Sequence, residues 1–164
     1  MTNNYSKVEG MLYSHYRRKD RINKLLSKKV RIEHRIDILK RDIKECKYEL
    51  ETTLQGIDYS ADKIQTSGIT SNIERELEKA VDRTLRELEY NIREKRKTNE
   101  KIRELNKKVD DTEILLEDLT EEEKQILELK YSERVSDKII ADMLTLSRPT
   151  VQRKRTEIIY YIGE

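Results

Sequence analysis

The chain has 164 residues, of which 35% are apolar and 41% are charged, and it contains neither tryptophan nor phenylalanine. Because an ordinary globular domain has about 25% charged residues, this composition excludes one large-cored globule and favours long helices that bury narrow apolar seams. The net charge of +2 hides an asymmetry, since residues 1–54 carry 14 Lys/Arg against 8 Asp/Glu, whereas residues 72–131 carry 14 against 18. Such asymmetry is typical of contact with nucleic acid or an acidic partner, or of oppositely charged helices that lie side by side.

The cysteine content and the N-terminus favour a cytoplasmic protein. Cys46 is the only cysteine, so no intramolecular disulfide can form, and the first residues lack the basic-then-apolar pattern of a secretory signal. No apolar run reaches the ~20 residues that cross a bilayer. We therefore expect a soluble cytoplasmic protein without membrane contacts.

The first predicted element, in residues 1–54, is a helix from about Ser6 to Leu54. Its apolar residues recur at alternate spacings of three and four, interrupted only at Lys29, which is typical of a coiled coil. The predicted seam consists of Ile22, Leu25, Ile32, Ile36, Leu39, Ile43, Cys46 and Leu50.

Residues 55–71 are predicted to form a linker, because glycine, serine, threonine and aspartate cluster there. Ser71 and Glu74 then match a capping box that would begin a second long helix over residues 72–119. Its expected seam is Leu77, Val81, Leu85, Leu88, Ile92, Ile102, Leu105, Val109, Leu116 and Leu119, weakened in the middle by Lys95, Thr98 and Asn99.

Both seams have a polar interruption, and the two would coincide in an antiparallel hairpin. If the chain folds back about Lys63, Lys29 lies opposite the polar stretch from Lys95 to Asn99. A buried polar layer is costly but specifies register, so the match favours the hairpin. The alternative is that both interruptions are simply solvated.

Residues 120–164 predict a separate domain of short helices. Thr120 and Glu123 form a capping box, followed at helical spacing by Ile126, Leu127 and Leu129. Ser136 is placed to cap a second helix. That helix carries Ile139, Ile140, Ala141, Met143 and Leu144.

A third helix follows the turn formed by Thr145 and Leu146. Ser147 is its expected cap, and Pro149, the only proline, falls in the first turn, where its missing N–H breaks no helical bond. We expect three side chains of this helix to point inward, those of Val151, Ile158 and Ile162.

Ala141, Leu146 and Val151 lie at five-residue steps, the arrangement that a helix-turn-helix needs. They would supply a close helix crossing, a buried turn residue and an anchor beneath the third helix. The sequence therefore predicts an all-α protein in which a long coiled-coil hairpin precedes a C-terminal three-helix helix-turn-helix domain.

The start of the third helix is basic, with four positive charges and no negative one between Ser147 and Arg155. In a major groove, arginine bonds guanine edges and glutamine bonds adenine edges, so we expect Arg148, Gln152 and Arg153 to read bases. Lys154 and Arg155 are expected to contact phosphates. The full predicted DNA-binding set is Ser147, Arg148, Thr150, Gln152, Arg153, Lys154 and Arg155. The alternative is a basic helix that only caps a bundle.

The stretch "LTEEEKQILELKYSERVSDKIIADMLTLSRPTVQRKR" resembles region 4 of bacterial sigma factors, which reads the −35 promoter element. The wider plan, including the linker "GIDYSADKIQTSGITSNIE", resembles phage-encoded transcriptional regulators of the RinA/ArpU type. The resemblance implies regulation of phage late or packaging genes in a bacterial cell, with RNA polymerase as a further partner.

Two features depart from the pattern that this resemblance implies. Thr145 stands where such turns often use glycine or asparagine, so we expect a different turn or some strain. The loop "KYSERVSDK" also lacks its usual glycine.

Together these features predict a sequence-specific DNA-binding regulator, homodimeric through its coiled coil, because one small module offers little contact surface. If the hairpin closes on itself, four-helix packing between two hairpins would still give a dimer. The alternative is a coiled-coil scaffold that binds another protein. We expect no catalysis, cofactor or metal, because His15, His34 and Cys46 form no recognisable site.

Overall fold

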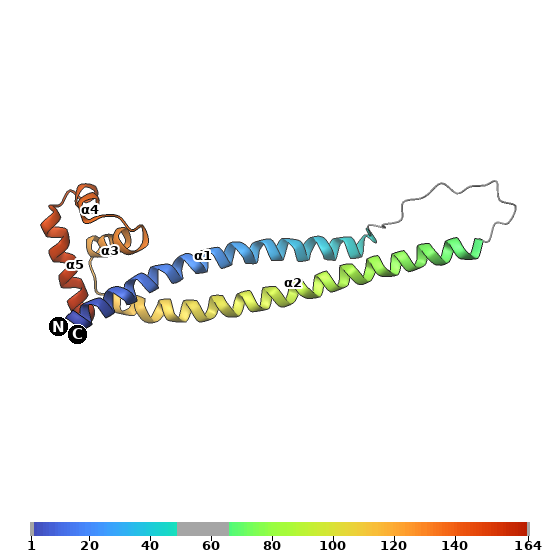
Figure 1. The fold of residues 1–164 in the computed structure, drawn as a ribbon, viewed down its shortest axis with the longest axis horizontal. Helices are drawn as coiled ribbons and strands as arrows, with labels where there is room; N and C mark the ends of the chain where they lie inside the picture. Colours follow the sequence, from blue (N-terminus) through green and yellow to red (C-terminus); the bar gives the residue numbers. More distant parts are fainter. Residues whose placement is uncertain (1, 49–65, 164) are drawn as a thin grey trace. The chain divides into compact units, whose positions relative to one another are not determined.

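The computed structural model describes residues 2–48 and 66–163, and these residues are all-α, as predicted. The long second helix packs against the long first helix. The elements in order are α1 (Thr2–Lys44), α2 (Thr66–Leu116), α3 (Glu121–Leu127), the π-helical turn η1 (Glu128–Ser132), α4 (Asp137–Met143) and α5 (Arg148–Gly163) (Figure 1). Contacts divide the chain into a terminal unit, Met1–Ser27 with Glu100–Glu164, and a hairpin unit, Lys28–Asn99.

Helix α1 starts and ends earlier than the sequence pattern predicts, at Thr2 and at Lys44. At its C-terminal end the Lys47 amide donates to the Asp42 carbonyl oxygen at 2.9 Å, and the Cys46 amide donates to that of Ile43 at 3.3 Å. This is the Schellman pattern, which places Cys46 in the left-handed region with a φ of 53°. Cys46 is exposed, so its predicted place in the seam is wrong; Leu50 lies outside the described residues.

Helix α2 begins at Thr66, earlier than predicted. Ser71 and Glu74 lie inside the helix, so the capping box predicted there is wrong. Of the predicted linker, residues 55–65 lie outside the described residues and residues 66–71 are helical.

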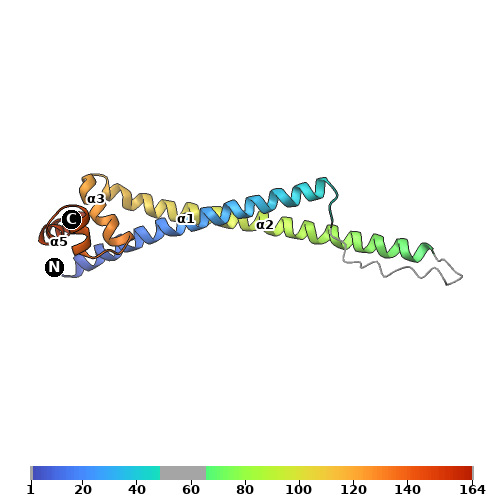
Figure 2. The ribbon, with the colours of Figure 1, turned by 90° about the horizontal axis from the view of Figure 1, so that it is seen from above.

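In the hairpin unit, α1 and α2 lie side by side and antiparallel (Figures 1 and 2). Ile32, Ile36 and Leu39 are buried, which confirms this part of the predicted α1 seam. The facing sides of the two helices also carry paired charges. The Lys28 and Lys95 ammonium groups lie 2.9 and 2.8 Å from the Glu94 and Glu33 carboxylates respectively.

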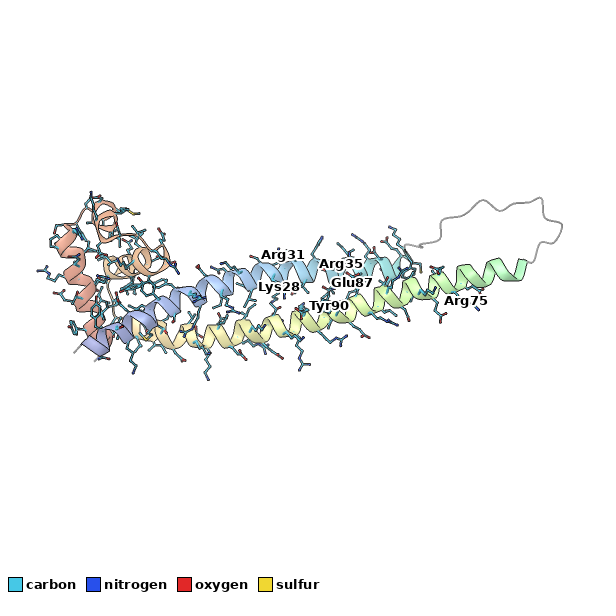
Figure 3. All side chains as sticks on the ribbon, in the orientation of Figure 1. Lys28, Arg31, Arg35, Arg75, Glu87 and Tyr90 are labelled. Atoms are coloured by element: carbon cyan, nitrogen blue, oxygen red, sulfur yellow. The ribbon has the colours of Figure 1, made fainter. Side chains whose placement is uncertain are left out.

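Arg35 and Glu87 face each other across the same pair of helices (Figure 3). The guanidinium makes two hydrogen bonds to the carboxylate, of 2.6 and 2.8 Å, a geometry that orients both groups. The bonds from Arg35 lower the pKa of Glu87. All three interhelical pairs lie within about one helical turn of the predicted register.

The polar interruption in the two seams is partly enclosed. Thr98 is buried and Lys29 is half-buried, whereas Lys95 extends to its ion pair with Glu33. The interruption is therefore a polar layer between the helices rather than a fully solvated stretch.

The face of α2 that meets α1 in the hairpin unit differs from the predicted one. Leu77, Leu85 and Ile92 are 43%, 42% and 49% exposed, whereas Ala80 is buried and Thr84 is half-buried. The predicted seam uses four-residue steps at its start, and each such step turns about 40° around the helix axis. The apolar stripe therefore winds away from α1, and small or polar residues face it instead.

The terminal unit has two apolar clusters. The first joins the start of α1, the end of α2, α3, η1 and α5; its buried members are Val8, Leu12, Leu116, Leu119, Leu127, Tyr131, Ile158 and Ile159. The second consists of Ile126, Ile140, Ala141 and Val151, with Leu129, Val135, Leu144 and Leu146 packed against it. The second cluster lies within α3, α4 and α5, while the first holds α5 against the start of α1.

Candidate nucleic-acid interface

Helix α3 begins with the predicted capping box. The Thr120 amide donates to Glu123 Oε2 at 2.9 Å, and the Glu123 amide donates to Thr120 Oγ1 at 3.4 Å. The bond from the Thr120 backbone is the main cause that lowers the pKa of Glu123. This confirms the sequence prediction for the start of the domain.

The loop between η1 and α4, which has no glycine, also contains a residue with φ in the left-handed region. After η1, Arg134 has a φ of 57°, and the Val135 amide donates to the Leu129 carbonyl oxygen at 2.9 Å. Ser136 then occupies the N-cap position of α4, but its side chain makes no capping hydrogen bond. The prediction that this hydroxyl caps α4 is therefore wrong.

The turn between α4 and α5 carries the predicted strain. Thr145 has a φ of 55°, and the Leu146 amide donates to the Ala141 carbonyl oxygen at 2.9 Å, as in a Schellman closure. Ala141 and Val151 are buried and Leu146 is half-buried against them. The three residues at five-residue steps therefore make the crossing, the turn and the anchor that the sequence predicted.

Helix α5 has the predicted N-terminal cap. The Thr150 amide donates to Ser147 Oγ at 3.2 Å, and the hydroxyls of Ser147 and Thr150 lie 2.7 Å apart. Pro149 lies in the first turn, where it disrupts no helical bond. Two candidate DNA-binding residues, Ser147 and Thr150, are thus held at the helix start, the first exposed and the second half-buried.

The three predicted base-reading residues lie at the surface, although the Gln152 side chain also makes a hydrogen bond to Asp137. Arg148, Gln152 and Arg153 are exposed, and Arg148 and Gln152, four residues apart, share one face of α5. Arg153 lies 3.7 Å from Glu157 in an ion pair whose side chains are both largely exposed. Such a pair is weak in water, so it leaves the guanidinium accessible.

The two residues predicted to contact phosphates, Lys154 and Arg155, differ in their burial and in their partners. Lys154 is half-buried and lies 3.1 Å from Glu122 of α3. The Arg155 side chain is only 17% exposed, and its guanidinium lies 3.1 Å from Glu9 and 3.5 Å from Asp137. The position of Arg155 does not agree with a phosphate contact; it is held between carboxylates of α1 and α4.

Arg155 belongs to a half-buried polar network in the terminal unit. The Tyr131 hydroxyl donates to Glu9 Oε1 at 3.0 Å, and the Lys130 ammonium donates to Asp137 Oδ1 at 2.7 Å. Burial alone would raise the pKa of Asp137, but the Lys130 bond and the Arg155 charge outweigh it and lower the pKa. The network joins α1, η1, α4 and α5. Glu9 stands 146 residues before Arg155, so no local pattern predicts their contact.

His15 is buried beside Tyr16, which packs against the first apolar cluster. It is 1% exposed, and its Nδ1 atom has no hydrogen-bond partner among the described residues. Burial, and then the charge of Lys19, lower its pKa, which favours the neutral ring. It borders a cavity of about 680 Å³ whose walls include Glu113 and Glu117. His34 is exposed on α1 of the other unit.

The described residues contain no group of three or more His, Cys, Asp or Glu side chains placed to hold a metal ion. Within the same residues, every helix is too short or too polar to cross a bilayer. Comparison with protein families, characterised proteins and solved structures finds nothing that matches this chain. The resemblance to sigma region 4 therefore rests on the residues of this chain alone.

Proposed function

We propose that the chain is a sequence-specific DNA-binding regulator whose contact surface is the exposed face at the start of α5. The observation that carries the proposal is the division of this helix into two sides. Val151 is fully buried in the helix-turn-helix core, whereas Arg148, Gln152 and Arg153 are exposed. A helix that packs on a core by one side and exposes cations and an amide on the other suits insertion into a major groove.

Each exposed group has a defined chemistry toward a duplex. The guanidinium groups of Arg148 and Arg153 can each make two bonds to a guanine edge, and the Gln152 amide matches an adenine edge. The start of α5 also has a positive dipole end, which suits a phosphate, although Pro149 has no N–H and the Thr150 amide is bonded to Ser147. Lys154 is a weaker candidate for phosphate contact because it must leave Glu122 first.

Regulation of transcription follows from the resemblance to sigma region 4, which also implies contact with RNA polymerase. One module supplies little contact area for tight specific binding, so the proposal includes a homodimer that presents two modules to paired half-sites. The wider resemblance to regulators of the RinA/ArpU type supports the further proposal that the chain is a phage-type transcriptional regulator acting in a bacterial cytoplasm. A coiled-coil scaffold that binds another protein is the competing function.

Titration of random-sequence duplex DNA, measured by fluorescence anisotropy at several salt concentrations, tests the proposal. The wild type should bind more weakly as salt rises, because bound cations displace counterions from the duplex. Arg153→Glu should lower the affinity by about tenfold or more, the effect expected when a contact of 1–3 kcal/mol is lost.

Arg86→Glu is the matched control, since Arg86 is an exposed arginine of the hairpin unit in a similar i,i+4 ion pair with Asp82. It makes the same charge change away from α5 and should keep most of the affinity. Equal weak binding by the wild type and both variants would reject DNA binding and leave the scaffold. If the wild type does bind, selection of bound sites from random duplexes would give the operator and its half-site spacing.

A further inference from the structure

The described residues of the hairpin unit leave an apolar stripe on α2 uncovered. It consists of Leu77, Val81, Leu85, Leu88 and Ile92. Leu77, Leu85 and Ile92 are each more than 40% exposed, and the other two are half-buried. At 1.5 Å per residue the stripe is about 22 Å long.

Single exposed apolar side chains are common on protein surfaces, but an aligned row is not. Here the row runs along four turns of one helix in a chain with 41% charged residues. The side of α2 that meets α1 carries Ala80 and Thr84 instead. The larger side chains are thus directed away from the intramolecular contact, where a partner could bury them.

The spacing of the stripe is close to symmetric about Leu85. If a second α2 lies antiparallel on it, Leu77 faces Ile92 of the second copy and Val81 faces Leu88 of the second copy. Leu85 then meets its own equivalent. A surface that matches itself under a twofold rotation is what an isologous homodimer requires.

The charges beside the stripe favour the same orientation. Residues 74–79 at its first end carry three acids and two bases, whereas residues 93–97 at its last end carry four bases and one acid, one of these bases, Lys95, being paired with Glu33 of α1. An antiparallel pair brings Glu78 of one copy toward Arg93 of the other, whereas a parallel pair would place like charges together. Complementary flanks specify orientation in helix pairs.

We propose that a second copy of this chain packs on the α2 stripe, antiparallel and centred on Leu85, so that two hairpins form the dimer. The inference rests on the homodimer of the proposed function and names its surface. Burial of five leucine, valine and isoleucine side chains from each copy supplies the driving force.

Sedimentation equilibrium without DNA tests the surface. The wild type should be a dimer at micromolar concentration, and Leu85→Glu should be a monomer because two carboxylates would meet on the twofold axis. Since Leu85 is 42% exposed in the single chain, the variant should keep its helical circular dichroism. Tyr90→Glu is the control, because Tyr90 is 60% exposed and lies about 140° around the helix axis from Leu85. It should leave the dimer intact.

Disulfide trapping tests the orientation, in a Cys46→Ser background so that no native thiol takes part. A mixture of Leu77→Cys and Ile92→Cys chains should form a cross-linked pair on oxidation, because a disulfide requires Cα atoms less than about 7 Å apart. Neither chain should cross-link with itself, as a parallel pair would. A monomeric wild type, a dimeric Leu85→Glu or self-cross-linking would each overturn the proposal.

These outcomes are separate from those of DNA binding. Arg153→Glu should remain a dimer even where it fails to bind duplex. A dimer that binds no DNA would reject DNA binding but keep this surface, and a monomer that binds DNA would reject this surface and the homodimer but keep DNA binding.

Discussion

Cys46, Arg134 and Thr145 adopt φ values of 53°, 57° and 55°, in the left-handed region. A residue other than glycine is disfavoured there by about 1–2 kcal/mol, because its Cβ approaches the following carbonyl oxygen. Each of the three follows a helical element, α1, η1 or α4. The next amide in each case donates back into the preceding helix, so hydrogen bonding holds the strained residue. Glycine, the usual signal of a helix end, is absent at all three.

Thr145→Gly should raise the free energy of unfolding by about 0.5–1 kcal/mol. Removal of the Cβ relieves the left-handed strain, and the greater freedom of glycine in the unfolded chain offsets part of the gain. The Thr145 hydroxyl bond to the Leu144 carbonyl oxygen is exposed, so its loss costs little. Urea unfolding followed by circular dichroism measures the change.

Thr145→Ala is the control for that substitution, since alanine loses the hydroxyl but keeps the Cβ. It should show no gain in stability. If glycine were no better than alanine, the left-handed turn would not be a source of strain.

The elements of the terminal unit are held by one polar network as well as by apolar clusters. Arg155 of α5 lies between Glu9 of α1 and Asp137 of α4, and Tyr131 of η1 also donates to Glu9. The π-helical turn places Lys130 and Tyr131 in successive positions that reach different carboxylates. A basic residue in the predicted recognition helix therefore contributes to packing between elements.

Arg155→Met should lower the free energy of unfolding by about 2–3 kcal/mol, because it leaves the half-buried Glu9 and Asp137 with fewer cationic partners. Arg153→Met, at a residue whose side chain is 72% exposed, should change stability by less than about 0.5 kcal/mol. Chemical denaturation of both variants at neutral pH measures the contrast. Equal stabilities would show that the network contributes nothing to folding.

At the scale of the whole molecule, the two proposals are coupled through the number of modules that reach one duplex. A dimer makes the second contact intramolecular, and effective concentrations of linked sites raise overall binding by about 10²–10⁴. The number of phosphates neutralised, and with it the salt dependence, also rises with the number of modules.

Leu85→Glu should therefore weaken binding to a duplex with two half-sites by about 10²-fold or more and roughly halve the slope of log affinity against log salt. Tyr90→Glu, which makes the same charge change in the same helix, should retain both quantities. Anisotropy titrations at several salt concentrations provide the measurement. An unchanged affinity and slope in Leu85→Glu would mean that one module binds alone.

Several features followed from the sequence because they depend on neighbours in the chain. The α1 seam at Ile32, Ile36 and Leu39 follows from a local period, and the caps at Thr120 and Ser147 need only a hydroxyl three residues before an amide. The burial of Ala141 and Val151 likewise followed from their spacing, because each lies five residues from Leu146. Short-range periodicity determined these elements, and it also determined the all-α class.

Tertiary structure alone decided which side of α2 meets α1 and which cations of α5 are free. Both the stripe at Leu85 and the side at Thr84 repeat with helical period, so the pattern could not choose between them until the position of α1 was known. Arg155 looks like Arg153 in the sequence, but Glu9 and Asp137 engage it in the fold. The reason is physical: periodicity is a property of one helix, whereas burial and pairing depend on segments brought together from distant parts of the chain.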